Sequence, residues 1–166
     1  MNRKDIVQAL LKNKTLEVVV MGDSMYPVIH QQDVLTVEAV GEYNIGDIIV
    51  YQYEGEMLVH RIIKKTATTY FCKGDNTFRL EKIEDTDIVG KVCKLFRSGK
   101  RIPLLKVNNQ FIEMSYKIHM LYLKNKFDKN IVKETKIYKS SVSFLRSMTV
   151  AASNAAMNGW STTLAV

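Results

Sequence analysis

Three short clusters in the first half of the chain carry side chains that could perform nucleophilic and acid–base chemistry. Ser24 lies between Gly22 and a proline three residues later, so a turn could hold its hydroxyl and backbone N–H open to solvent. His60 lies within an apolar segment and carries an imidazole that can act as a general base near neutral pH. Asp75 follows Gly74 where a strand ends. Together the three clusters supply the serine, histidine and aspartate of a hydrolytic triad.

Each cluster also has an ordinary structural explanation. Residues 22–27 could form a plain polar turn. A single histidine on a strand is more often a packed or exposed side chain than a catalyst, and Asp-Asn after glycine is common turn chemistry. The catalytic interpretation therefore depends on the three clusters occurring together.

Short β-type runs separated by turn residues surround these clusters. They occupy residues 16–21, 34–40, 47–53, 57–63, 68–72 and 88–96. Six short strands within about 80 residues predict a mainly β, compact and largely antiparallel domain of sandwich or barrel type. Residues 2–14 fit a short helix that precedes it.

The pattern becomes helical after Pro103. Phe111, Met114, Ile118 and Leu121 are spaced as one apolar stripe of a helix, with lysines on either side. We therefore predict a catalytic β-domain over residues 1–103. A basic helical extension with an uncharged tail is predicted over residues 104–166.

The net charge of +7 is distributed unevenly. Residues 1–90 carry a net charge of −4, residues 91–140 carry +10 and residues 141–166 carry +1. This distribution indicates an anionic partner for the second part of the chain. Residues 106–139 could lie against an anionic membrane surface, or could form a solvated helix packed on the β-domain. Nucleic acid is less favoured, because no DNA-binding motif accompanies the charge.

Cysteine usage and hydropathy exclude several classes of protein. Cys72 and Cys93 form no CxxC pair, and neither has a histidine nearby, so we expect neither a structural metal site nor a disulfide scaffold. No organic cofactor is indicated. No run is apolar and long enough for a signal peptide or a transmembrane helix. We therefore expect a peripheral membrane or cytoplasmic location.

An ordered series of motifs resembles the signal peptidase I superfamily, which also includes the self-cleaving repressor peptidases. The motifs occupy residues 22–27, 32–37, 45–51, 59–62, 71–76 and 88–92, so the resemblance covers about residues 18–96. A lysine stands at the position of His60 in the bacterial form of the family. Histidine there is typical of the endoplasmic-reticulum and archaeal subgroup.

The resemblance implies roles for individual residues. Ser24 would be the nucleophile, His60 the general base and Asp75 the carboxylate that orients the imidazole. Gly22 stands where many bacterial members have a hydroxyl residue thought to help stabilise the oxyanion. The implied function is a serine endopeptidase that cleaves a peptide or preprotein, at a leader or signal segment, after small residues by acyl transfer.

Two other functions remain open on the same β-fold. One is a regulatory or binding protein that is non-catalytic or cleaves only itself, and the other is an inactive member of the family. The tail offers pairs of small residues at a spacing that signal peptidases accept, Val150 with Ala152 and Ser153 with Ala155. These pairs would be the sites of self-processing.

Overall fold

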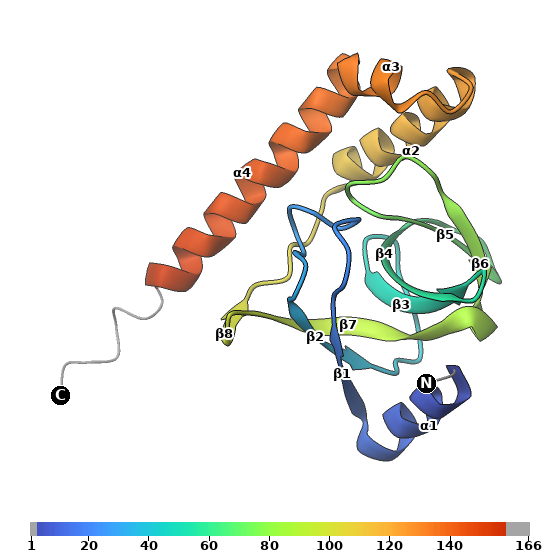
Figure 1. Cartoon of the computed structure of the whole chain (residues 1–166), viewed down its shortest axis with the longest axis vertical. Coiled ribbons are helices and arrows are strands. Elements are labelled where there is room, and N and C mark those ends of the chain that lie inside the picture. Colours follow the sequence, from blue (N-terminus) through green and yellow to red (C-terminus); the bar gives the residue numbers. More distant parts are fainter. Residues whose placement is uncertain (1–2, 159–166) are drawn as a thin grey trace.

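The computed structural model describes residues 3–158 (Figure 1). Helix α1 spans Arg3–Asn13 and is followed by β1 (Thr15–Val19), β2 (Val34–Glu38), β3 (Ile48–Tyr53), β4 (Glu56–Lys65), β5 (Thr69–Lys73) and β6 (Glu81–Glu84). A 3₁₀ turn, Asp85–Asp87, leads into β7 (Ile88–Arg97) and β8 (Lys100–Ile102). The helices α2 (Asn109–Lys124), α3 (Lys129–Glu134) and α4 (Lys136–Asn158) follow.

The strands form one antiparallel sheet in the order β1-β2-β7-β3-β4-β5-β6, with β8 paired to β7. The sheet curls strongly, and β3 to β6 form its most curved part (Figure 1). This architecture confirms the mainly β, antiparallel fold class and the N-terminal and C-terminal helices. The strands β6 and β8 and the short helix α3 were not predicted from the sequence.

Strand β3 contributes side chains to two hydrophobic cores, one on each of its faces. Ile48 and Val50 pack in one core, whereas Ile49 and Tyr51 pack in the other. Successive side chains of a strand point to opposite faces, so a strand buried on both faces contributes to both cores. Tyr51 is fully buried in the second core, which places its hydroxyl among the polar residues described below.

Helix α2 packs its apolar stripe on the body of the protein. Phe111 is fully buried and Ile118 is 2% exposed, and the Phe111 ring stacks on Phe144 of α4 with the ring centroids 5.6 Å apart. Asn108 caps the helix by accepting a hydrogen bond from the Phe111 N–H. The stripe therefore belongs to the core and is not available to a membrane, in agreement with the alternative of a helix packed on the β-domain.

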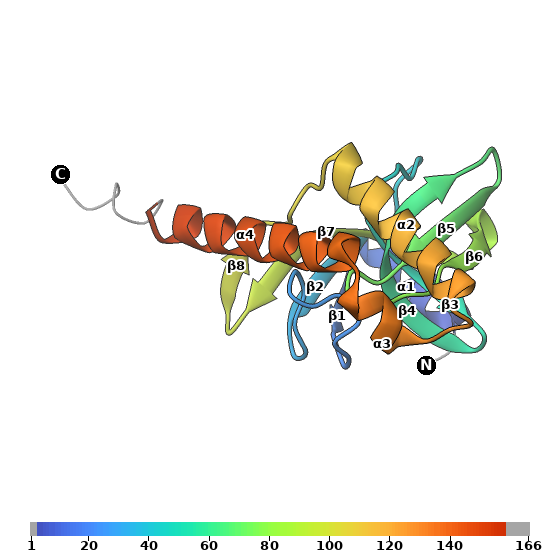
Figure 2. The same cartoon turned by 90° about the horizontal axis from the view of Figure 1, so that it is seen from above.

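Helix α4 packs against α2 and β8 and then continues away from the sheet (Figure 2). Of the predicted processing pairs, Val150 lies on this helix and is 60% exposed. The side chains of residues 152–155 lie outside the described part of the structure. Within the described residues, no helix combines the length and the apolar character needed to cross a membrane.

Candidate active site

Ser24 and His60 meet although 36 residues separate them in the chain. Ser24 lies in the turn segment between β1 and β2, and His60 lies on β4. The Ser24 Oγ is 3.0 Å from His60 Nε2, a distance at which the hydroxyl can donate to the imidazole. The imidazole is almost fully buried, whereas Ser24 is partly exposed. The pair has the geometry of a nucleophile beside its general base.

Glu81 is the carboxylate that contacts the other side of the imidazole. His60 Nδ1 lies 3.1 Å from Glu81 Oε2, and both side chains are buried. An ionised carboxylate can only accept a hydrogen bond, so this contact places a proton on Nδ1 and leaves Nε2 free to accept from Ser24. The Ser24, His60 and Glu81 side chains therefore form a continuous hydrogen-bonded chain.

Tyr51 completes this buried cluster. Its hydroxyl donates to Glu81 Oε2 at 3.2 Å and lies 3.0 Å from His60 Nδ1. Burial raises the pKa of Tyr51 above its ordinary value, and the nearby Glu81 carboxylate raises it further. Tyr51 therefore stays a neutral donor and helps to fix the position of the Glu81 carboxylate.

Asp75 is not beside His60, contrary to the expectation from the resemblance. Its two oxygens accept hydrogen bonds from Arg61, from Nε at 3.0 Å and from Nη2 at 2.7 Å. Both side chains are completely shielded from solvent. A bidentate pair with arginine occupies both carboxylate oxygens. Asp75 is therefore engaged in a buried ion pair, and Glu81 takes the place expected for it.

The turn that follows β5 holds the Ser24 segment by backbone contacts. The Asn76 N–H donates to the Ser24 carbonyl at 2.8 Å, and the Asn76 side chain donates to the Asp23 carbonyl at 3.2 Å. A Cβ at Gly74 would lie 2.5 Å from the Ser24 carbonyl oxygen and 2.9 Å from His60 Nε2. Glycine at this position therefore allows the turn to approach both Ser24 and His60.

Lys73 is a buried lysine next to this cluster. Its Nζ donates to the Gly74 carbonyl at 3.1 Å. Burial lowers the pKa of Lys73 to about 8, although the Asp75 and Glu81 carboxylates act in the opposite direction. Within the described residues, no hydrogen bond joins Lys73 to Ser24, so the geometry favours His60 as the base.

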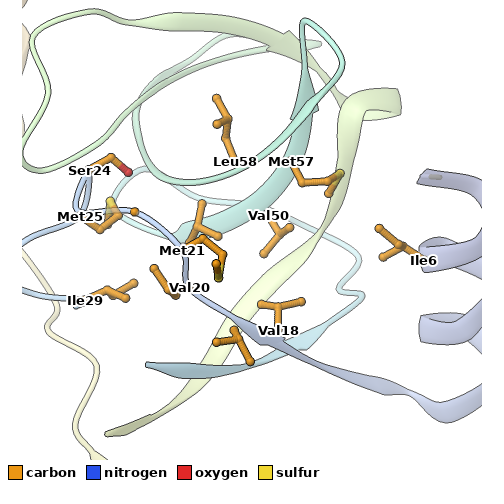
Figure 3. A pocket seen from close by; sticks show the side chains of 13 residues that line it. Ile6, Val18, Val20, Met21, Ser24, Met25, Ile29, Val50, Met57 and Leu58 are labelled. Atoms are coloured by element: carbon orange, nitrogen blue, oxygen red, sulfur yellow. The ribbon is translucent and has the colours of Figure 1, made fainter. Parts of the chain in front are cut away.

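An apolar cavity of about 340 Å³ opens next to Ser24 (Figure 3). Its wall combines side chains from α1, β1, the segment between β1 and β2, β3 and β4, including Ile6, Val18, Val20, Ile29, Val50 and Met57. Ser24 and Gly22 are also part of the wall. A substrate residue held over Ser24 could therefore place a small or apolar side chain in this cavity.

Glu81 and Tyr51 were not predicted from the sequence as site residues. The alternation within β6 is the signal that could have identified Glu81, because Glu81 and Ile83 are buried whereas Lys82 is exposed. A buried acid on an otherwise apolar strand face is typically paired. In the described residues, no group of histidine, cysteine and acidic side chains is arranged to hold a metal ion.

A curled antiparallel sheet that brings a serine beside a buried histidine and carboxylate is an arrangement suited to a serine peptidase. A family model described as Peptidase S24-like matches residues 3–93, which is more than half of the chain. The chain belongs to the Peptidase S24-like family. No curated protein matches the chain.

Proposed function

We propose that this protein is a serine endopeptidase of the signal peptidase type, which cleaves a peptide or leader segment after small residues. The observation that carries the proposal is the 3.0 Å contact between Ser24 Oγ and His60 Nε2, with Glu81 bound to the opposite nitrogen. Membership of the Peptidase S24-like family supports a peptidase function at the family level.

The proposed reaction is acyl transfer through Ser24. His60 Nε2 accepts the hydroxyl proton as Ser24 Oγ bonds to the carbonyl carbon of the substrate. The imidazolium that forms is stabilised by Glu81 and then gives its proton to the departing amine, which breaks the peptide bond. Water, activated by the same imidazole, hydrolyses the ester and regenerates Ser24. Asp75 takes no part in these steps, because both of its oxygens bind Arg61.

The apolar cavity and the edge of the sheet support the proposed substrate class. Strand β1 is the first strand in the sheet order, and Val19 and Met21 are 54% and 73% exposed. An extended peptide could add to this edge by main-chain hydrogen bonds and place a small side chain in the cavity beside Ser24. His60 is the residue typical of the endoplasmic-reticulum and archaeal subgroup of signal peptidases. We therefore propose that the protein resembles this subgroup more than the bacterial form.

The test is cleavage of a peptide with alanine before the scissile bond by wild-type protein, Ser24→Ala and His60→Ala. We expect each variant to lose at least about 10⁴-fold in rate and to keep the wild-type circular dichroism spectrum. Product masses locate the cut. If Ser24→Ala cleaves at the wild-type rate in a preparation free of other proteases, the proposal is wrong. If the wild-type protein cuts only its own chain, at the small-residue pairs of the tail, the self-cleaving alternative replaces it.

We also propose that the helical extension contacts anionic membranes, through a face other than its buried apolar stripe. Four apolar side chains of this extension are between 41% and 60% exposed: Met120 and Leu123 on α2, Phe127 in the turn between α2 and α3, and Ile131 on α3. Lys124 and Lys126 are exposed within the same stretch. Each lysine close to an anionic surface contributes about 1 kcal/mol, so shallow insertion of Phe127 with these charges would give reversible binding.

Vesicle sedimentation tests this membrane contact. We expect binding to phosphatidylglycerol vesicles that weakens with salt, and weaker binding to phosphatidylcholine vesicles. Phe127→Ser should reduce the binding. The matched control is Ile45→Ser, which removes an apolar side chain of similar exposure (51% against 60% for Phe127) from the β-domain. Equal binding to neutral and anionic vesicles, or no binding at low salt, would overturn the proposal.

A further inference from the structure

Ser24 lines a second cavity, whose walls differ from those of the apolar one. This cavity measures about 550 Å³ and is lined on one side by the Ser24 turn and the segment from Asn76 to Arg79. The other side comes from the helical extension, through Tyr122 of α2, Lys129 and Lys133 of α3 and Tyr138 of α4. Among the residues that the structure describes, Ser24 alone lines both cavities. A peptide bound across Ser24 would therefore lie partly in each.

The second cavity carries an excess of positive charge. Arg79, Lys129 and Lys133 are exposed, and within the described residues none of them forms an ion pair with a carboxylate. Its acidic lining residues are Asp23 and Glu81, and Glu81 is already bound to the imidazole. A concave surface with unpaired cations attracts anionic ligands.

An aromatic cluster fixes these cations relative to Ser24. Phe78 stacks on Tyr138 with ring centroids 5.4 Å apart and contacts Tyr122 at 5.7 Å. His119 of α2 also contacts this segment, because its Nδ1 lies 3.2 Å from the Phe78 carbonyl and 3.3 Å from the Leu80 nitrogen. The helical extension is thus joined to the segment that leads into Glu81, and the lysines of α3 are held beside the reaction centre.

From this arrangement we infer that the second cavity binds acidic residues on the leaving-group side of the scissile bond. The inference rests on the proposed peptidase function, which assigns the acyl side of the substrate to the apolar cavity. The remaining part of the peptide then enters the cavity with Arg79, Lys129 and Lys133. Lys129 and Lys133 of α3 lie outside residues 3–93, so the helical extension supplies two of the three cations and the matched family segment supplies Arg79.

Three peptides test the inference. They share alanine before the scissile bond and carry Glu-Glu, Gln-Gln or Lys-Lys at the second and third positions after it. Exposed ion pairs are individually weak, so three cations together should favour Glu-Glu over Gln-Gln by about tenfold in kcat/KM at low salt, with Lys-Lys slowest. The preference should shrink at about 0.5 M salt, where screening is strong.

The matched variants are Lys129→Gln/Lys133→Gln and Lys94→Gln/Lys100→Gln. Both remove two positive charges from exposed positions, but Lys94 and Lys100 lie on β7 and β8 and do not line the cavity. We expect the first variant to lose most of the preference for Glu-Glu over Gln-Gln, measured as the ratio of the two kcat/KM values. The second should keep the preference. Equal cleavage of all three peptides by the wild type, or an unchanged preference in the first variant, would overturn the inference.

A binding measurement separates this inference from the peptidase proposal. Fluorescently labelled fragments that represent the leaving-group side, with Glu-Glu or Gln-Gln, are titrated with the Ser24→Ala protein. We expect the Glu-Glu fragment to bind more tightly, and this difference to disappear in Ser24→Ala/Lys129→Gln/Lys133→Gln. That result would support the binding of acidic residues in the second cavity even if no peptide were cleaved. Equal binding of both fragments would overturn the inference, whereas cleavage by Ser24→Ala would overturn only the peptidase proposal.

Discussion

Arg61 binds both carboxylate oxygens of Asp75, at 3.0 and 2.7 Å, within the buried interior of the protein. The preceding residue, His60, binds Glu81 instead. Neighbouring side chains of a strand point to opposite faces, so these two residues of β4 cannot approach the same carboxylate. The two acids therefore have separate functions, and mutation of each should give a different result.

Glu81→Gln should lower kcat/KM by about 10³-fold or more, because an amide can donate to the imidazole and so favour the wrong tautomer.

Asp75→Asn should instead lower the free energy of unfolding by about 3 to 5 kcal/mol, since it leaves the Arg61 charge buried without its partner. Peptide cleavage is measured at a temperature where circular dichroism shows both variants folded. Under that condition, folded Asp75→Asn should keep its rate within about tenfold of wild type. If Asp75→Asn lost more rate than Glu81→Gln, Asp75 and not Glu81 would be the carboxylate that orients the imidazole.

Gly74→Ala should damage the site by a steric route. The new Cβ would lie 2.5 Å from the Ser24 carbonyl oxygen, which is a backbone atom and cannot move aside cheaply. We expect the Ser24 segment to shift and the rate to fall by at least about 10²-fold, because small displacements of a nucleophile are costly. Gly41→Ala provides a control at a glycine where a Cβ meets no atom within 4 Å and the backbone is outside the left-handed region. Wild-type activity in Gly74→Ala would show that the turn is not in close contact with the site.

Lys73 should make stability depend on pH in the alkaline range. Burial lowers its pKa from 10.5 to about 8, so between these values the unfolded chain binds more protons than the folded one. The free energy of unfolding therefore rises with pH in that window. Relative to Lys73→Met, the wild-type protein should gain about 2 kcal/mol between about pH 8 and pH 10. Urea unfolding of both proteins at the two pH values measures the difference. If the free energy of unfolding changed equally in both proteins between the two pH values, the lowered pKa of Lys73 would be contradicted.

Gly22→Ser should increase the rate of the proposed peptidase. A Cβ at Gly22 meets no atom within 4 Å, so a side chain fits there. A serine hydroxyl two residues before the nucleophile could add a donor to the oxyanion. Since one such donor is worth roughly 10²-fold or more in the best geometry, we expect a rise in kcat of about tenfold. Gly22→Ala controls for backbone stiffening. An equal change in both variants would mean that the hydroxyl gives no assistance.

The local features of the molecule could be predicted from the sequence. Alternation of apolar residues and turn chemistry identified most of the strands, because the period of two depends only on neighbouring residues. The same local motifs brought Ser24 and His60 to attention, and the structure places these two side chains in contact. The apolar stripe of α2 was also predicted, with packing on the β-domain as one of two alternatives, whereas its contact with α4 was not.

The partners of these residues were decided only by the tertiary structure. Glu81 reaches His60 because β5 and β6 pair with Cys72 opposite Glu81, and no local pattern fixes that register. Asp75 binds Arg61 because strand alternation turns Arg61 away from the imidazole. Phe111 faces Phe144 of α4 and not a membrane, and α3 brings Lys129 and Lys133 to the cavity beside Ser24. A sequence specifies which face of an element is apolar or charged, but what covers that face depends on contacts between segments far apart in the chain.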